Sequence, residues 1–139
     1  NLLSTMTALE NVALPLTFQG VDKAKRLKKA SALLDLVKLG KYKNHRPTQM
    51  SGGQQQRVGV ARALVVDPEI IFADEPTGNL DPVTADGIMR LFLTIARSGC
   101  AVVMSTHNTN LIEEYPARTL VFEKGRVKEV DMQALLGRI

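Results

Sequence analysis

The sequence predicts an α/β fold in which a helical subdomain is followed by a mostly parallel sheet flanked by helices. Two short apolar runs, at residues 70–73 and 100–104, lack polar alternation, as strands covered on both faces do. A stretch with helical spacing separates the two runs, and parallel strands require a crossover of that kind. We therefore expect an α-helical part at residues 1–50 and an α/β part at residues 51–139.

The helical part begins with apolar residues at helical spacing: Leu9, Val12 and Leu16. Pro15 is expected to kink or end this first helix, because proline lacks the N–H that an inner turn needs. A second helix is expected from Asp22, as its N-cap, to about Leu39, with Gly40 as the C-cap glycine. The polar residues 41–50 then lead to a glycine pair.

The α/β part alternates between helix and strand. Its first helix is expected to stop at Asp67-Pro68, and a later one to begin at Pro82, which suits a first helical turn. A hairpin-like pair of strands is expected across Lys124-Gly125. In chain order the expected elements are a helix at 53–65, a strand at 70–73, a helix at 82–98, a strand at 100–104, hairpin strands at 119–122 and 127–130, and a terminal helix at 131–139.

Composition sets limits without selecting a function. Aromatic residues make up 4% of the chain and Trp is absent, so we expect an aliphatic core. Lys and Arg outnumber Asp and Glu by 18 to 14, and this excess permits an anionic partner but selects none. The single Cys100 excludes an intramolecular disulfide. No apolar run approaches the roughly 20 residues of a membrane-spanning helix.

An acid pair, Asp74-Glu75, closes the first apolar run. Ligands of open α/β sheets bind beyond the carboxyl ends of the strands, so two carboxylates at that point face a binding crevice. Because side chains alternate along a strand end, one carboxylate can hold a metal while the other points at a water. Two solvated acids that open a loop explain the same residues equally well.

A serine and two glycines stand before the first helix of the α/β part, in the segment Ser51-Gly52-Gly53-Gln54. Glycines let a backbone approach a ligand closely, and a helix start offers unpaired amides with positive dipole character. The serine hydroxyl adds a donor, so the segment is equipped for an anion such as phosphate. Taken alone, an N-cap serine followed by flexible glycines is the better interpretation.

A histidine, His107, follows the second apolar run in the segment Ser105-Thr106-His107. If the two strands run parallel, His107 lies on the same sheet edge as Glu75. A lone histidine after a strand is more often structural than catalytic, and the shared edge is what favours a functional role.

The order and spacing of these segments resemble the ABC ATPase family. In that family Ser51-Gly52-Gly53-Gln54 would be the signature motif, residues 70–75 Walker B, Gly78-Asn79-Leu80-Asp81 the D-loop and His107 the H-loop. The resemblance covers essentially the whole chain and implies the C-terminal part of a P-loop NTPase-like ABC ATPase domain. Residues 72–81 together with 10–16 look most like the subclass that contains the bacterial lipoprotein-release, macrolide-export and cell-division ATPases.

The resemblance also implies a role for individual residues. Asp74 would hold Mg²⁺, Glu75 would polarise the attacking water, and His107 would contact the γ-phosphate of ATP. The signature segment Ser51-Gly52-Gly53-Gln54 would close over the γ-phosphate of a nucleotide bound to the opposite protomer. Asp81 would line the dimer seam and help to couple the two sites. These roles fit phosphoryl transfer, in which the protein mainly positions groups and stabilises charge.

For the whole protein the resemblance implies a homodimer that binds ATP and Mg²⁺ at the cytoplasmic face of the inner membrane. An integral membrane permease or envelope protein would be contacted by residues 1–50, without any nucleic acid. The alternative is a truncated, non-hydrolysing cassette that acts as an interaction module on a membrane protein. A soluble ABC-type ATPase acting on nucleic acid is disfavoured, because residues 1–50 contain no long coiled-coil insertion.

Basic residues at 23–29 fit a solvated helix face better than a nucleic-acid site, and could also lie near anionic lipid headgroups.

The chain departs from the family pattern in three places. Met50 stands where the signature usually opens with Leu, a volume-conserving exchange. Asn108 follows His107 where Asp is common, which removes any role for a carboxylate there. No segment matches G-x-x-x-x-G-K-[ST], and the chain does not begin with Met. We therefore expect a fragment that neither binds ATP tightly nor hydrolyses it on its own.

Overall fold

The structure is a computed structural model that describes residues 1–131 and residue 134. The chain forms two compact units, Asn1–Ser105 and Thr106–Ile139. The division predicted from the sequence lies elsewhere, between a helical part at residues 1–50 and an α/β part at residues 51–139, and it stays a prediction. The predicted terminal helix at 131–139 falls almost entirely on residues outside the described part.

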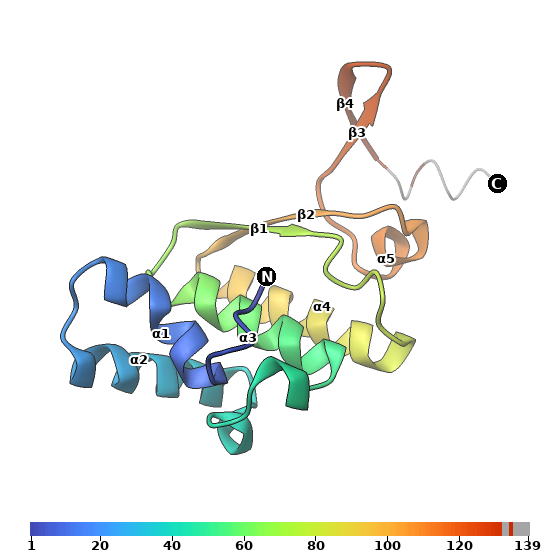
Figure 1. Ribbon diagram of the computed structural model, residues 1–139. Coiled ribbons are helices and arrows are strands. Elements are labelled where there is room, and N and C mark those ends of the chain that lie inside the picture. Colours follow the sequence, from blue (N-terminus) through green and yellow to red (C-terminus); the bar gives the residue numbers. More distant parts are fainter. Residues whose placement is uncertain (132–133, 135–139) are drawn as a thin grey trace. The chain divides into compact units, whose positions relative to one another are not determined.

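The first unit contains most of the secondary structure (Figure 1). In chain order its elements are α1 (Ala8–Phe18), α2 (Lys23–Leu36), the 3₁₀ turns η1 (Gly40–Tyr42) and η2 (Pro47–Gln49), α3 (Gly52–Leu64), β1 (Ile70–Asp74), α4 (Pro82–Arg97) and β2 (Ala101–Ser105). Helices α1, α2 and α3 pack on one another, while α3 also packs on α4 and α4 packs on β2. Helix α3 therefore connects the helical part to the strands. No helix among the described residues is long and apolar enough to cross a membrane.

Pro15 was expected to kink or end helix α1. The helix runs through it to Phe18, so the end at the proline is wrong, and a kink stays a prediction. Val12 and Leu16 are buried on either side of Pro15, because this helix packs on α2 and α3. Burial of such side chains contributes about 1.5–3 kcal/mol each, which offsets the single backbone hydrogen bond that proline removes.

Helix α2 starts after Asp22 as predicted but ends at Leu36, three residues earlier than expected. The left-handed residue at its end is Lys38, with φ 64°, and Gly40 instead begins η1. Leu39 then donates its N–H to the carbonyl of Leu34 at 2.8 Å, which is the bond of a Schellman motif. Leu39 is buried, so the left-handed turn at Lys38 brings the side chain of Leu39 back to the core.

A guanidinium joins three helices of the first unit. Arg57 of α3 donates from Nη1 to the carbonyl of Val37, which caps α2, at 3.3 Å. A Cβ atom on Gly87 of α4 would lie 2.9 Å from Nη2 of the same side chain. Arg57 therefore passes over α4 at the one point where that helix has no side chain.

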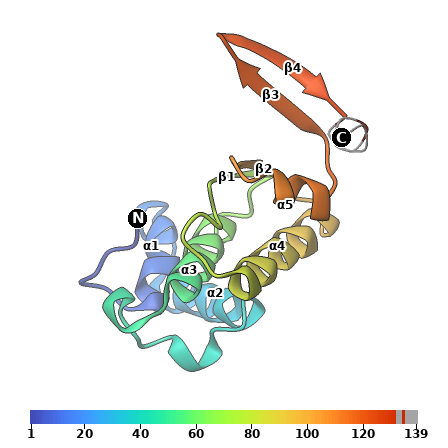
Figure 2. The same cartoon turned by 90° about the vertical axis from the view of Figure 1, so that its right-hand side faces the viewer.

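Strands β1 and β2 pair in parallel, as predicted, with Asp74 opposite Ser105. Figure 1 and Figure 2 both show helices α1–α4 of the first unit on one side of this pair. Ile71 is buried, whereas Phe72 is 77% and Val103 46% exposed. Among the described residues the expected cover is thus present on one face of the strands only.

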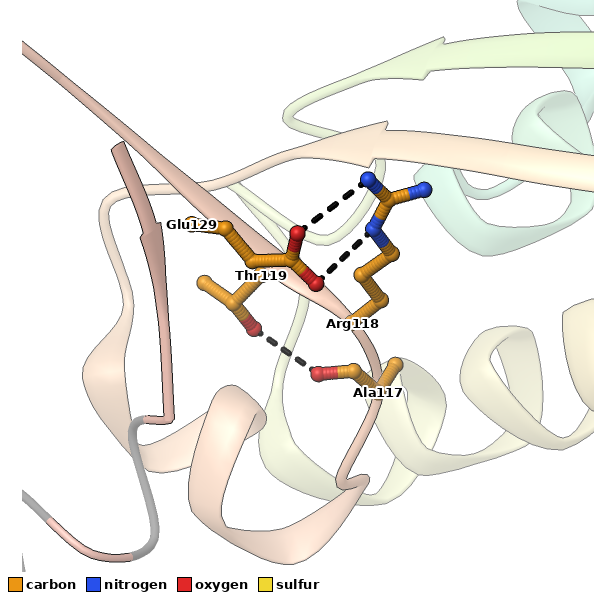
Figure 3. A network of polar contacts seen from close by, with 4 residues as sticks. All are labelled: Ala117, Arg118, Thr119 and Glu129. Atoms are coloured by element: carbon orange, nitrogen blue, oxygen red, sulfur yellow. Dashed lines mark hydrogen bonds and ion pairs between the residues drawn. The ribbon is translucent and has the colours of Figure 1, made fainter. Parts of the chain in front are cut away.

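The second unit contains α5 (Thr109–Glu114) and a hairpin of β3 (Thr119–Glu123) and β4 (Arg126–Val130). The predicted turn is confirmed, since Lys124 and Gly125 both have positive φ, at 48° and 72°, as a two-residue hairpin loop requires. Arg118 holds Glu129 with two hydrogen bonds of 2.9 and 3.2 Å (Figure 3). This pairing raises the pKa of Arg118 above its usual range.

Candidate functional site

The acid pair lies where β1 ends and is held by the neighbouring strand. Ser105 donates its hydroxyl hydrogen to Oδ1 of Asp74, its partner in the register. The N–H of Glu75 points at the same serine, 3.1 Å from both its Oγ and its carbonyl oxygen. One side chain of β2 thus fixes the carboxylate of one acid and the backbone of the other. Ser105 was noted in the sequence without a role, and only the strand register reveals one.

The backbone of Glu75 is left-handed, with φ 46°. This conformation costs a non-glycine residue roughly 1–2 kcal/mol, and such residues cluster at functional sites. The chain turns there, and Gly78 donates its N–H back to the carbonyl of Glu75 at 3.1 Å. Pro76 and Thr77 are buried directly after the acid pair. The turn is therefore anchored on both sides of Glu75.

The acid pair suits magnesium better than a metal that needs several protein ligands. Among the described residues no three His, Cys, Asp or Glu side chains are grouped to hold a metal ion. Mg²⁺ is commonly bound by one or two carboxylates, with waters and substrate phosphates completing its octahedron. Asp74 is exposed at the strand end and offers such a carboxylate, so the residues present fit this ion.

The segment before α3 forms a capping box. Ser51 Oγ accepts the N–H of Gln54 at 3.2 Å, and Gln54 Oε1 accepts the N–H of Ser51 at 2.9 Å. A hydroxyl that accepts one bond still has its hydrogen to donate, so Ser51 can cap the helix and bind an anion at the same time. Gly52 and Gly53 occupy the first positions of α3, whose N-terminal amides favour negative charge. The helix start is compatible with both sequence interpretations.

Asp81 caps α4. Its Oδ2 accepts the N–H of Thr84 at 3.1 Å, and its Oδ1 accepts the Thr84 hydroxyl. The Thr84 hydroxyl, followed by the Thr84 amide, holds the pKa of Asp81 below its usual value. Asp81 is exposed, which is compatible with a place on a dimer seam. That place stays a prediction.

His107 belongs to the second unit and lies two residues beyond the end of β2. Asn108, which stands where a carboxylate was considered, is the N-cap of α5, and its Oδ1 accepts the N–H of Asn110 at 3.0 Å. Asn108 thus has a local structural role. The contact of His107 with a phosphate stays a prediction.

Two of the predicted motifs meet within the first unit. The start of α3 lies against the turn that follows the acid pair, since a Cβ atom on Gly52 would be 3.4 Å from Leu80. Gln56, one turn further along α3, donates Nε2–H to the carbonyl of Pro76 at 2.7 Å. Sequence reasoning gave Gln56 no role, because a hydrogen bond across 20 residues leaves no local pattern.

Comparison with known proteins gives a consistent result. A family model described as ABC transporter matches residues 1–78. An uncharacterized ABC transporter ATP-binding protein of Thermotoga maritima is 45% identical over 136 residues, which cover 98% of this chain and 58% of the relative. The methionine import ATP-binding protein MetN of Brucella abortus is 43% identical over 130 residues, which cover 93% of this chain and 35% of that protein.

A solved structure has the same fold. It is the ATP-binding cassette MJ0796, described as a dimer in a post-hydrolysis state bound to ADP and Pi. It matches with a TM-score of 0.76 at 40% identity, over 93% of this chain and 59% of that chain. The chain thus spans well under two thirds of the length of these relatives.

Proposed function

The chain belongs to the ABC transporter family, and from this membership we propose that it is part of an ATP-hydrolysing subunit that drives a membrane partner. The observation that carries the proposal is the acid pair at the carboxyl end of β1, which Ser105 of the adjacent parallel strand holds by a hydrogen bond to Asp74. Ligands of α/β folds bind at this edge of the sheet.

In this proposal Glu75 orients and polarises the water that attacks the γ-phosphate of ATP. Asp74 holds Mg²⁺, which supplies positive charge against the phosphate oxygens when bound. His107 donates a hydrogen bond to the γ-phosphate. Positioning and charge stabilisation account for the catalysis of phosphoryl transfer, so no covalent enzyme intermediate is required. The anchored turn after Glu75 supports this role, because it keeps the carboxylate in place before substrate arrives.

A second copy of the protein completes each site. The segment Ser51-Gly52-Gly53-Gln54 of one copy closes over the nucleotide of the other, with Asp81 at the seam between them. The dimeric state of MJ0796 supports this arrangement. The exposed Ser51 hydroxyl and the first amides of α3 are suitable groups for a phosphate.

The membrane partner is an integral permease or envelope protein that contacts residues 1–50, and the subunit binds it at the cytoplasmic face of the inner membrane. The relatives named as transporter subunits support a transport role. Within the family we propose the subclass of lipoprotein-release, macrolide-export and cell-division ATPases, from the pattern of residues 72–81 and 10–16.

The test is Glu75→Gln in the full-length protein. We expect ATP binding to persist and kcat to fall by about 10²–10⁴-fold, the contribution typical of a general base. The control is Glu69→Gln, an exposed glutamate directly before the opposite end of β1. A Glu75→Gln protein with the wild-type kcat would refute the assignment.

The second candidate function that we propose is the alternative stated from the sequence, a non-hydrolysing interaction module. The 139 residues contain no G-x-x-x-x-G-K-[ST] loop to cradle the β- and γ-phosphates. We propose that the 139-residue chain alone does not turn over ATP, and Glu75-dependent hydrolysis by that chain would contradict this. A phosphate-binding loop encoded in frame ahead of Asn1 would exclude the module.

A further inference from the structure

Three consecutive glutamines at the start of α3 have three different partners. Gln54 completes the capping box with Ser51. Gln55 donates Nε2–H to the carbonyls of Pro47 at 3.0 Å and Met50 at 3.2 Å, so it holds the segment before the helix. Gln56 alone reaches the turn after the acid pair, at the carbonyl of Pro76.

The bond from Gln56 lies in a close contact between α3 on one side and the turn with the start of α4 on the other, which we name the α3 seam. It consists of Gly52, Gly53 and Gln56 on the helix and Pro76, Leu80 and Thr84 on the other side. A Cβ atom on Gly53 would lie only 2.3 Å from Cγ2 of Thr84. The two backbones approach this closely only because the helix begins with two glycines.

The side-chain amide of Gln56 donates to the backbone carbonyl of Pro76. Pro76 is buried, and the carbonyl of a buried residue needs a hydrogen-bond partner. The 2.7 Å bond from Gln56 provides one. Since Pro76 directly follows Glu75, the side chain of Gln56 fixes the backbone one residue beyond the proposed catalytic carboxylate.

We propose that Gln56 is a positioning residue that makes the acid pair and the start of α3 of the same chain move together. This inference rests on the proposed function. In the dimer, the acid pair serves the nucleotide of its own chain, and the start of α3 serves the nucleotide of the partner. A rigid seam within each chain therefore links the two sites. Binding at the α3 start of one chain biases the position of Glu75 in that chain, which gives positive cooperativity between the sites.

The experiment compares Gln56→Met and Gln56→Glu with Gln55→Met in the full-length protein. Both changes at residue 56 remove the donor at nearly constant side-chain length. The change at residue 55 removes a donor of the same kind, on the same helix, that points at residues 47–50 instead. All variants are measured for ATP affinity, kcat, the Hill coefficient of hydrolysis, and amide hydrogen exchange without nucleotide.

Hydrogen exchange tests the seam without any reference to hydrolysis. The N–H groups of Gly78 and Leu80 bond within the turn, to the carbonyls of Glu75 and Thr77. We expect both changes at residue 56 to speed exchange at these two amides by about tenfold, the effect of weakening local structure by about 1.4 kcal/mol. Gln55→Met should leave them unchanged. Equal exchange in all variants would overturn the inference.

The kinetics test what the seam does. We expect the residue 56 variants to lower kcat by about tenfold and the Hill coefficient toward 1, with ATP affinity retained. A merely structural role would instead lower the amount of folded protein and leave kcat per folded molecule and cooperativity intact, which would overturn the inference. A wild-type protein without ATPase activity would refute the proposed function, whereas the exchange rates would still decide whether the seam exists.

Discussion

The replacement Gly53→Ala tests the closeness of α3 and α4 directly. The new Cβ would lie 2.3 Å from Cγ2 of Thr84, about 1.2 Å short of the roughly 3.5 Å at which carbon atoms pack well. Thr84 cannot simply rotate away, because its hydroxyl is bonded to Asp81 and rotation would break that bond. We therefore expect the alanine to force the helices apart.

The magnitude follows from two opposing effects. Overpacking by one methyl group costs about 1–3 kcal/mol, whereas replacing a helical glycine by alanine contributes about 0.5–1 kcal/mol of stability. Gly53→Ala should thus destabilise the protein by about 1 kcal/mol at the middle of these ranges and by at most about 2.5 kcal/mol. In the Thr84→Ser background the clashing Cγ2 is gone and the nearest atom of residue 84 is Cβ at 3.8 Å, an ordinary contact. There the same replacement should be neutral or stabilising.

The assay is urea unfolding of the four proteins of this double-mutant cycle, with the free energy of unfolding taken from the transition. Gly59→Ala is the matched control, because it lies in the same helix and its Cβ would meet nothing within 4 Å. It should stabilise the protein by about 0.5–1 kcal/mol. If Gly53→Ala has the same effect with Thr84 and with Ser at that position, the steric reasoning is wrong.

Three further predictions follow from single contacts. Asn11 is fully buried and forms hydrogen bonds with the backbone of Leu3, Met6 and Thr7. Asn11→Ala should therefore lower the free energy of unfolding, measured by urea titration, by about 2–4 kcal/mol. A loss below about 0.5 kcal/mol would contradict the importance of these bonds. The pKa of Asp81 is lowered, so the stability that its cap contributes is present at pH values above the ordinary pKa of 3.8 and is lost as the pH falls through the lower pKa of the folded state. Thr84→Val should raise the pKa of the Asp81 carboxyl, as measured by NMR titration. An unchanged pKa would show that the Thr84 hydroxyl is not the cause. In the full-length protein Ser105→Ala should weaken Mg²⁺ affinity, because it removes the hydroxyl that holds the carboxylate of Asp74. Ser105→Thr keeps a hydroxyl and should retain the affinity, as measured by calorimetry with bound nucleotide. Equal affinities in the two variants would refute the role of the hydroxyl.

Much of the chain follows from local patterns. The apolar runs that became β1 and β2, the helix start at Pro82 and the hairpin turn at Lys124-Gly125 were each predictable, because sequence-adjacent residues determine them. The candidate acid pair is of the same kind, since the residues that end a strand of a parallel sheet lie at the sheet edge.

The errors arose where distant contacts decide. Pro15 does not end α1, because burial of its neighbours in the three-helix packing outweighs the lost hydrogen bond. Lys38 rather than Gly40 takes the left-handed position, because Leu39 has to reach the core. The roles of Ser105 and Gln56 were missed for the same reason: their partners lie 31 and 20 residues away.

The guanidinium that crosses α4 makes two positions of the sequence dependent on each other. A Cβ atom at residue 87 would require the end of the Arg57 side chain to shift, and Nη1 of the same group donates to the carbonyl of Val37. Because the atom that must move is the far end of a flexible side chain, a small substitution at residue 87 costs little, and its cost falls on the bond from Arg57 to Val37. Across the evolutionary history of this cassette, we expect large side chains at residue 87 mainly where residue 57 is no longer arginine.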